Sequence, residues 1–177
     1  EWKILDDTLL IVMSDHGEPF GEHGTMRKYG VPVYDELSKI VLFMRAPGLM
    51  PAGKRIDPVV LNLDLAPTIC GALGIERNER FEGLNMMPLI NDEKSLLRET
   101  SFMGAYNLRA AALTEEWKYI DNRGEKENEL FNRTDDPAEK NNLIADEQKT
   151  AADLHRKIWD FAQNWSDSLF WRNHPME

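Results

Sequence analysis

Two short runs in the first quarter of the chain, TLLIVM at residues 8–13 and IVLFM at residues 40–44, are apolar on both faces. Strands with this pattern are typical of a parallel sheet that helices cover on both sides. The second run ends at the turn signal RAPG. The two runs therefore predict strands of an α/β sheet.

Residues 59–75, VVLNLDLAPTICGALGI, predict a short strand followed by a helix. Asp64 suits the N-cap, Pro67 is tolerated in the first turn, and Gly74 marks the end of the helix. The next segment, FEGLNMMPLIN, predicts a compact loop because glycine and proline interrupt it.

The pattern changes after residue 95, beyond a charged stretch that predicts a connector. LRAAALTEEWKYIDN alternates loosely, NRGEKEN is a turn signal and ELFN is a short strand, so we expect an antiparallel meander. A long amphipathic helix follows. Its apolar residues recur at helical spacing: Ala151, Leu154, Ile158, Phe161, Ala162 and Trp165.

These elements predict an α/β fold in two parts. Residues 1–95 would form the C-terminal part of a mostly parallel sheet sandwiched by helices. Residues 96–177 would form a small antiparallel sheet packed with the long C-terminal helix. Trp117 and Tyr119 lie on a predicted strand, where core packing competes with a role in lining a sugar-binding cleft.

Composition narrows the choice of partners. The 177 residues are 42% hydrophobic, enough for a core, and carry a formal net charge of -10. This charge argues against nucleic acid or an anionic membrane surface as a partner. No apolar run approaches the roughly 18 residues that span a bilayer. The single cysteine, Cys70, cannot form an internal disulfide.

The candidate chemistry follows the first strand. Asp15 and His16 lie at its carboxyl end, where ligands gather in parallel sheets, and Gly17 permits the backbone to turn there. A carboxylate and an imidazole supply half the ligands of a metal site. The alternative interpretation is a helix cap or a solvated pair of loop side chains.

Two further polar residues follow in the same segment. His23, in GEHG, has the chemistry of a ligand, an acid or base, or a simple loop histidine. Lys28 would neutralise a tetrahedral oxyanion without competing as a metal ligand; the alternative is a solvated surface lysine.

The stretch SDHGEPFGEHGTMRK resembles the sulfatase segment that carries a metal-binding Asp followed by Asn or His, then a Gly-Glu-His-Gly loop, then a lysine. Four later stretches resemble the same family in the same order: IVLFMRAPG, LDLAPTICGALGI, FEGLNMMPLI and ELFNRTDDPAEKNNL. Together they cover nearly the whole chain. The resemblance is to the C-terminal portion of sulfatases, in the alkaline phosphatase superfamily.

The resemblance implies that Asp15 and His16 bind a calcium ion that holds a sulfate ester, and that Lys28 contacts the sulfate oxygens. His23 matches the Gly-Glu-His-Gly loop of the family and is a candidate catalytic residue, although the resemblance assigns it no specific role. The implied substrate is a small-molecule or glycan sulfate ester. Because imidazole suits softer cations than calcium, Mn²⁺ or another divalent metal is the alternative.

The family's formylglycine nucleophile arises in a Cys/Ser-x-Pro-x-Arg motif, which the chain lacks, since Cys70 is followed by GALG. We therefore expect this to be the C-terminal fragment of a longer sulfatase, inactive alone, whose N-terminal remainder carries the formylglycine. Sheet surface left open by the missing part would favour self-association. The alternatives are a phosphoesterase or phosphonate monoester hydrolase of the same superfamily, and a non-catalytic module.

Overall fold

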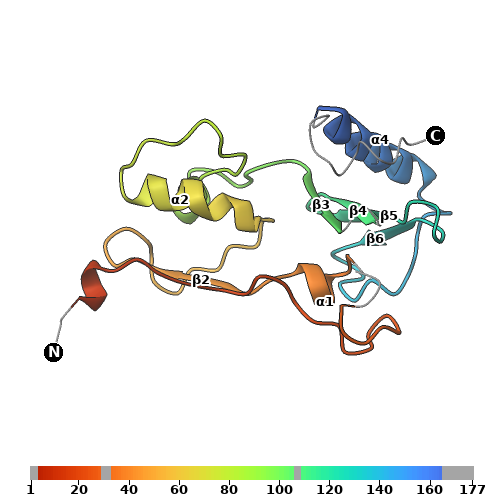
Figure 1. The fold of residues 1–177 in the computed structure, drawn as a ribbon, viewed down its shortest axis with the longest axis horizontal. Coiled ribbons are helices and arrows are strands. Elements are labelled where there is room, and N and C mark those ends of the chain that lie inside the picture. Colours follow the sequence, from red (N-terminus) through yellow and green to blue (C-terminus); the bar gives the residue numbers. More distant parts are fainter. Residues whose placement is uncertain (1–3, 29–32, 106–108, 165–177) are drawn as a thin grey trace. The chain divides into compact units, whose positions relative to one another are not determined.

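The computed structural model describes residues 4–28, 33–105 and 109–164 (Figure 1). The chain divides into two compact units, residues 1–15 with 40–99 and residues 16–39 with 100–177. The predicted division at residue 95 concerned the catalytic and C-terminal parts of the family fold and stays a prediction. By compactness, segment 16–39 groups with the C-terminal residues.

The first unit contains the two predicted strands, β1 (Leu10–Met13) and β2 (Leu42–Arg45). They pair antiparallel, with Leu10 opposite Arg45, whereas the sequence favours parallel neighbours. An apolar pattern on both faces indicates that a strand is suited to burial on both sides. It does not determine whether the neighbouring strand runs parallel or antiparallel. In the described chain β1 is largely open, with Val12 53% exposed.

The helix predicted after residue 64 forms as α2 (Leu65–Ala72), preceded by the 3-10 turn η2 (Asn62–Asp64). No strand forms at residues 59–61, and the predicted loop contains a short helix, α3 (Met87–Ile90). Pro67 lies in the first turn of α2, as predicted.

Asp64 occupies the predicted N-cap position, but its side chain does not cap the helix. Instead, the fully buried carboxylate accepts hydrogen bonds from the amides of Leu61 and Leu84, each at 2.8 Å, and from both terminal nitrogens of Arg98. A buried carboxylate needs such pairing to offset its lost hydration. Asp64 thereby joins three segments of the first unit.

The second unit is built on an antiparallel sheet in the order β3-β4-β5-β6 (Figure 1). Its strands are β3 (Ser101–Ala105), β4 (Arg109–Leu113), β5 (Trp117–Asp121) and β6 (Glu129–Asn132). The predicted meander is confirmed. The sequence did not reveal β3, because SFMGA lacks a clear alternation.

The predicted amphipathic helix is also confirmed, as α4 (Gln148–Asn164), and it covers one face of this sheet (Figure 1). Trp165 lies outside the described residues. Tyr119 is 2% exposed and packs with helix residues, and Trp117 packs against the same cluster. Core packing is therefore confirmed for both aromatic residues. None of the described helices is long and apolar enough to cross a bilayer.

The other face of the sheet is covered by the segment that contains α1 (Asp35–Ser38). Val33 and Tyr34 of that segment are buried against a strand-derived cluster. The strand residues in this cluster are Ala111, Leu113, Ile120 and Phe131. Segment 16–39 groups with the second unit, and two of its described apolar residues, Val33 and Tyr34, are buried on this face.

Candidate active site

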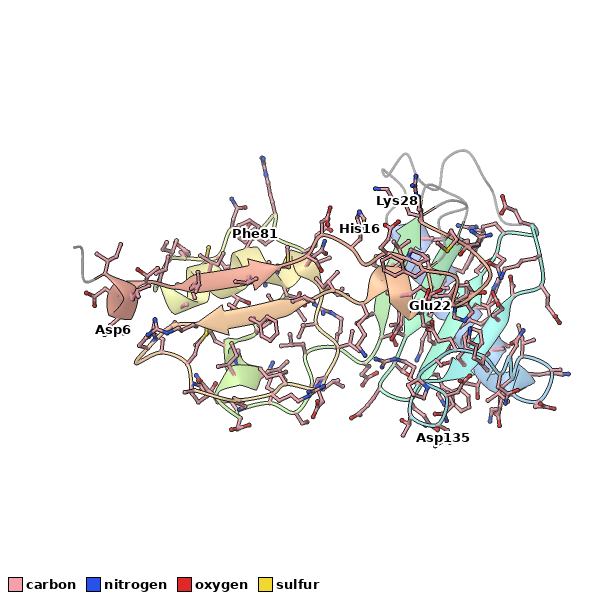
Figure 2. The ribbon with its side chains drawn as sticks, turned by 90° about the horizontal axis from the view of Figure 1, so that it is seen from below. Asp6, His16, Glu22, Lys28, Phe81 and Asp135 are labelled. Atoms are coloured by element: carbon pink, nitrogen blue, oxygen red, sulfur yellow. The ribbon has the colours of Figure 1, made fainter. Side chains whose placement is uncertain are left out.

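His16 and Lys28 lie side by side in the second unit (Figure 2). The Nζ atom of Lys28 is 3.3 Å from Nε2 of His16, and Nδ1 of His16 is 2.5 Å from the carbonyl oxygen of Gly17. With Nδ1–H donating to that carbonyl, the Nε2 lone pair faces the ammonium group. A backbone hydrogen bond on one ring nitrogen is the usual way in which a protein prepares the other nitrogen as a ligand.

Gly17 is required by close packing. A Cβ atom at this position would lie 2.1 Å from the carbonyl oxygen of Glu36, and the Gly17 amide donates to the Leu37 carbonyl at 2.7 Å. The predicted turn after the strand thus depends on the close approach of two backbones. Any side chain here would push the loop away from α1.

Asp15 closes the first compact unit and His16 opens the second. Joint coordination of one ion by these two residues stays a prediction. In the part of the chain that the structure describes, no three His, Cys, Asp or Glu side chains gather as a metal site.

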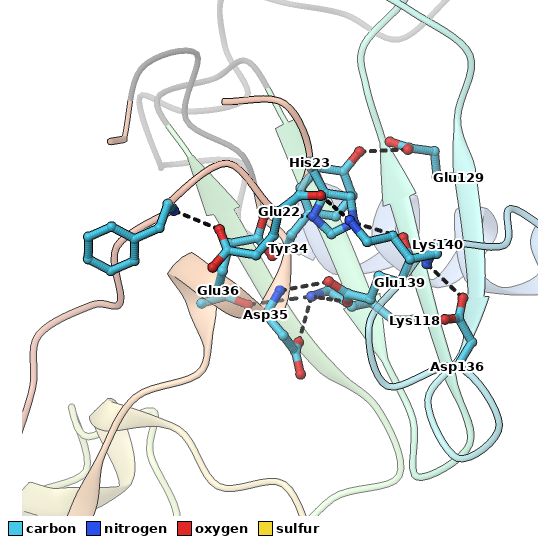
Figure 3. Close-up of polar contacts among 12 residues, drawn as sticks. Glu22, His23, Tyr34, Asp35, Glu36, Lys118, Glu129, Asp136, Glu139 and Lys140 are labelled. Carbon is cyan, nitrogen blue, oxygen red and sulfur yellow. Dashed lines mark hydrogen bonds and ion pairs between the residues drawn. The ribbon is translucent and has the colours of Figure 1, made fainter. Parts of the chain in front are cut away.

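His23 is held on three sides (Figure 3). Its Nδ1 lies 2.6 Å from Oε1 of Glu36, and its Nε2 lies 2.8 Å from the carbonyl oxygen of Glu139. The imidazole ring stacks on the Tyr34 ring with a centroid distance of 3.8 Å. Both ring nitrogens thus face oxygen acceptors within the protein. This geometry supports a loop-holding histidine over a metal ligand.

Glu139 belongs to a buried charge cluster that sequence reasoning missed (Figure 3). Lys118 is fully buried, and its Nζ lies 2.6 Å from Oε1 of Glu139 and 2.8 Å from Oδ1 of Asp35. The other carboxylate oxygen of Glu139 accepts the Asp35 amide at 2.7 Å. Lys118 is carried by β5, on the sheet face that segment 16–39 covers. The cluster therefore ties this segment to the sheet.

The local sequence explains the backbone at Glu139. In the turn DPAEK, the Asp136 carbonyl accepts the Glu139 amide at 3.0 Å, and Oδ2 of Asp136 accepts the Lys140 amide at 2.9 Å. Glu139 adopts the left-handed conformation, with φ of 55°. Strained backbones of this kind cost about 1–3 kcal/mol and persist when several contacts fix them. Here the contacts are those of the Glu139 carboxylate and carbonyl.

The two carboxylates of the cluster titrate differently. Burial by itself raises the pKa of Asp35, but the charge and hydrogen bond of Lys118 outweigh it, so the Asp35 pKa lies below its ordinary value. Burial dominates at Glu139 and holds its pKa above the ordinary value, despite the attraction of Lys118. Acid therefore protonates Glu139 before Asp35.

This difference predicts how stability depends on pH. Unfolded carboxylates take up protons near pH 4, while folded Asp35 stays ionised to lower pH, so its contribution to the unfolding free energy is lost as pH falls through its folded pKa. Glu139 acts with the opposite sign, because its raised pKa favours the folded state at low pH. We expect Glu139→Gln to steepen the loss of stability between pH 6 and pH 3. Urea unfolding across that range measures it, and a shallower loss in the variant would contradict the assignment.

Residues 21–164 match the family of the C-terminal region of N-sulphoglucosamine sulphohydrolase. This match covers well over half of the chain. The chain belongs to this sulfatase family. The resemblance of the sequence motifs is thereby confirmed at the level of the family.

Curated relatives of this sulfatase chain agree with the family match. It is 31% identical over 167 residues to an arylsulfatase from Clostridium perfringens, covering 89% of the chain and 34% of the relative. It is 29% identical over 171 residues to an uncharacterized sulfatase from Escherichia coli, covering 93% and 33%. The chain therefore spans about a third of the length of these relatives.

Solved structures show the same fold. A protein in complex with its substrate D-glucosamine-2-N,6-O-disulfate matches with a TM-score of 0.78 and 24% identity, covering 93% of the chain and 36% of that protein. Phosphonate monoester hydrolase of Agrobacterium radiobacter matches with a TM-score of 0.75 and 24% identity, covering 92% and 36%. The mixed α/β fold with its small antiparallel sheet and C-terminal helix is confirmed.

The structure also gives physical roles to the sulfatase-like stretch ELFNRTDDPAEKNNL. Glu129 accepts a hydrogen bond from the Tyr34 hydroxyl at 2.6 Å, Asp136 forms the turn, and Glu139 holds Lys118. The family motif singled out this stretch in the sequence. The structure shows that its Glu139 and Lys140 contact the loop of residues 17–28. The sequence only weakly indicates that Lys118 is buried and paired, because the one clue is a charged residue between Trp117 and Tyr119 in a predicted strand.

Proposed function

We propose that this chain supplies His16 and Lys28 to the active site of a longer, metal-dependent enzyme that hydrolyses sulfate esters. The observation that carries the proposal is the 3.3 Å separation between Lys28 Nζ and His16 Nε2. A metal ion at Nε2 and an ammonium group next to it would repel one another. At 3.3 Å the ammonium faces the Nε2 lone pair itself, so it would have to withdraw when a cation binds there. A sulfate group has oxygens enough to contact both the cation and the withdrawn ammonium.

The side chains fit a divalent cation in their chemistry. Asp15 offers carboxylate oxygens, and His16 offers a nitrogen whose partner nitrogen is already hydrogen-bonded to the backbone. Calcium is the first choice from the family resemblance, with Mn²⁺ or another divalent metal as the alternative. A bound cation would supply Lewis-acid polarisation of the ester oxygens, and the remaining ligands would come from the N-terminal part of the longer enzyme.

In this arrangement Lys28 would offset negative charge on the sulfate oxygens. The N-terminal part would hold the formylglycine, which would supply the nucleophile. Relatives named as arylsulfatase and choline-sulfatase, and the structural neighbour bound to a glucosamine disulfate, support a small-molecule or glycan sulfate ester as the substrate class.

The same site chemistry would suit a phosphate or phosphonate ester, and the likeness to phosphonate monoester hydrolase favours this as the second candidate. The third candidate is a non-catalytic module. The parent gene discriminates this module from an enzyme, because only the enzyme needs a Cys/Ser-x-Pro-x-Arg motif ahead of the residues described.

Metal removal tests the proposal on the full-length protein. We expect an aryl sulfate to be hydrolysed faster than an aryl phosphate diester, and a chelator to abolish turnover until Ca²⁺ or Mn²⁺ is restored. His16→Ala should weaken the binding of that metal at least tenfold, measured as the metal concentration that restores half of the activity, because a ligand is lost. Full activity after exhaustive chelation would contradict metal dependence, and preference for the diester would favour the second candidate.

A further inference from the structure

The loop of residues 17–28 is a closed hairpin that ends at Lys28. Phe20 and Met26 form an isolated antiparallel bridge, and the Arg27 amide donates to the Pro19 carbonyl at 2.9 Å. The tip of the hairpin is the GEHG segment, which contains His23. Because the returning arm leads directly into Lys28, the place of the tip sets the backbone position from which the Lys28 side chain extends.

The tip is fastened to a turn more than a hundred residues away in sequence (Figure 3). His23 reaches the Glu139 carbonyl through Nε2 at 2.8 Å, and Nζ of Lys140 donates to the carbonyl of Glu22. Nδ1 of His23 lies 2.6 Å from Oε1 of Glu36, a residue of α1. The hairpin is thus held at its tip from the 136–140 turn and from α1.

We propose that His23 is a positioning residue for Lys28. Its contacts with Glu36 and with the Glu139 carbonyl hold the tip on the 136–140 turn, which places the Lys28 ammonium beside His16. The inference about turnover rests on the proposed function, whereas the holding of the tip does not. His23 itself touches no reacting atom in this assignment.

The burial of His23 distinguishes it from an ordinary loop histidine. Its side chain is 12% exposed and that of Glu36 is 10% exposed, so water competes little for their hydrogen bond. The side chain of Lys28, in contrast, is exposed and has a flexible stem, so its place depends on its backbone and on its contact with His16. A shift of about 1 Å at a charge-neutralising group can lower turnover by about a hundredfold.

A double-variant cycle on the full-length enzyme tests the assignment. We expect His23→Ala to lower kcat for an aryl sulfate more than tenfold in the wild-type background and less than twofold in a Lys28→Ala background. His155→Ala is the matched control, because His155 is a part-buried histidine that contacts Tyr119 on the other face of the sheet. Its effect should be small and equal in both backgrounds. Equal losses from His23→Ala in both backgrounds would overturn the role of His23 in placing Lys28.

Amide hydrogen exchange supplies a readout that is independent of activity. His23→Ala should raise exchange of the Arg27 amide, which closes the hairpin, at least tenfold, and His155→Ala should leave it unchanged. Unchanged exchange in His23→Ala would overturn the inference whatever the enzyme does. An inactive wild-type enzyme would defeat the proposed function alone, and the exchange result would still decide whether His23 holds the hairpin.

A second variant covers the case in which His23→Ala does not fold. Lys140→Met removes the contact to the Glu22 carbonyl and leaves His23 and Glu139 in place. It should raise exchange of the Arg27 amide by a smaller factor, about threefold, and lower kcat only when Lys28 is present. Exchange equal to that of the wild type would count against the 136–140 turn as the support of the tip.

Discussion

Lys28→Ala in the full-length enzyme is expected to lower kcat for sulfate esters by about a hundredfold or more. Removal of one preorganised donor to a developing oxyanion commonly has an effect of this size. The structure supplies the geometric reason, since Lys28 Nζ lies 3.3 Å from the candidate ligand atom of His16. Steady-state kinetics with an aryl sulfate at saturating metal would measure the loss.

The control for Lys28→Ala is Lys149→Ala, a change of the same residue type at an exposed position of α4. It should keep kcat within twofold. Both variants should leave the unfolding free energy within about 0.5 kcal/mol of the wild type, as surface substitutions usually do. Near-normal turnover in Lys28→Ala would refute its role, and a stability loss in that variant alone would point to a structural effect.

Lys118→Met should have the largest effect on stability. The methionine would fill a similar volume but leave Glu139 and Asp35 facing one another without their cation. Breaking a buried ion pair by removing one partner typically costs about 3–5 kcal/mol, because an uncompensated charge stays buried. Urea unfolding at neutral pH, followed by circular dichroism, would measure this loss.

Lys39→Met is the matched control for Lys118→Met, because Lys39 pairs with the same Asp35 at 4.0 Å while its side chain is 78% exposed. It should cost less than about 1 kcal/mol, as exposed ion pairs do. Adding Glu139→Gln to Lys118→Met should recover part of the stability, since it removes one of the unpaired charges. A loss below about 1 kcal/mol in Lys118→Met would show that the cluster contributes little.

Local patterns accounted for several elements well. The spacing of Ala151, Leu154 and Ile158 predicted α4, and these residues are buried against the sheet. The alternation in LRAAALTEEWKYIDN predicted two strands of the meander. Such predictions succeed because the side-chain period of a helix or strand is visible within a few neighbouring residues.

The candidate site was only partly predictable. Asp15, His16 and Lys28 stand in one motif within fourteen residues, so their proximity in sequence suggested a shared role. The structure places Lys28 beside His16, while their shared role at a metal site stays a prediction. It also gives His23 a place between Glu36 and Glu139, which no local pattern indicated.

Local sequence was sufficient for the family resemblance, for the periodicity of the helix and strands, and for the motif that contains Asp15, His16 and Lys28. The tertiary structure was needed for the antiparallel pairing of β1 with β2, the three partners of the Asp64 carboxylate, and the burial of Lys118. Lys118 meets Asp35 across 83 positions of sequence. Periodicity depends on neighbours along the chain, whereas the partner of a buried charge depends on which distant segments pack together.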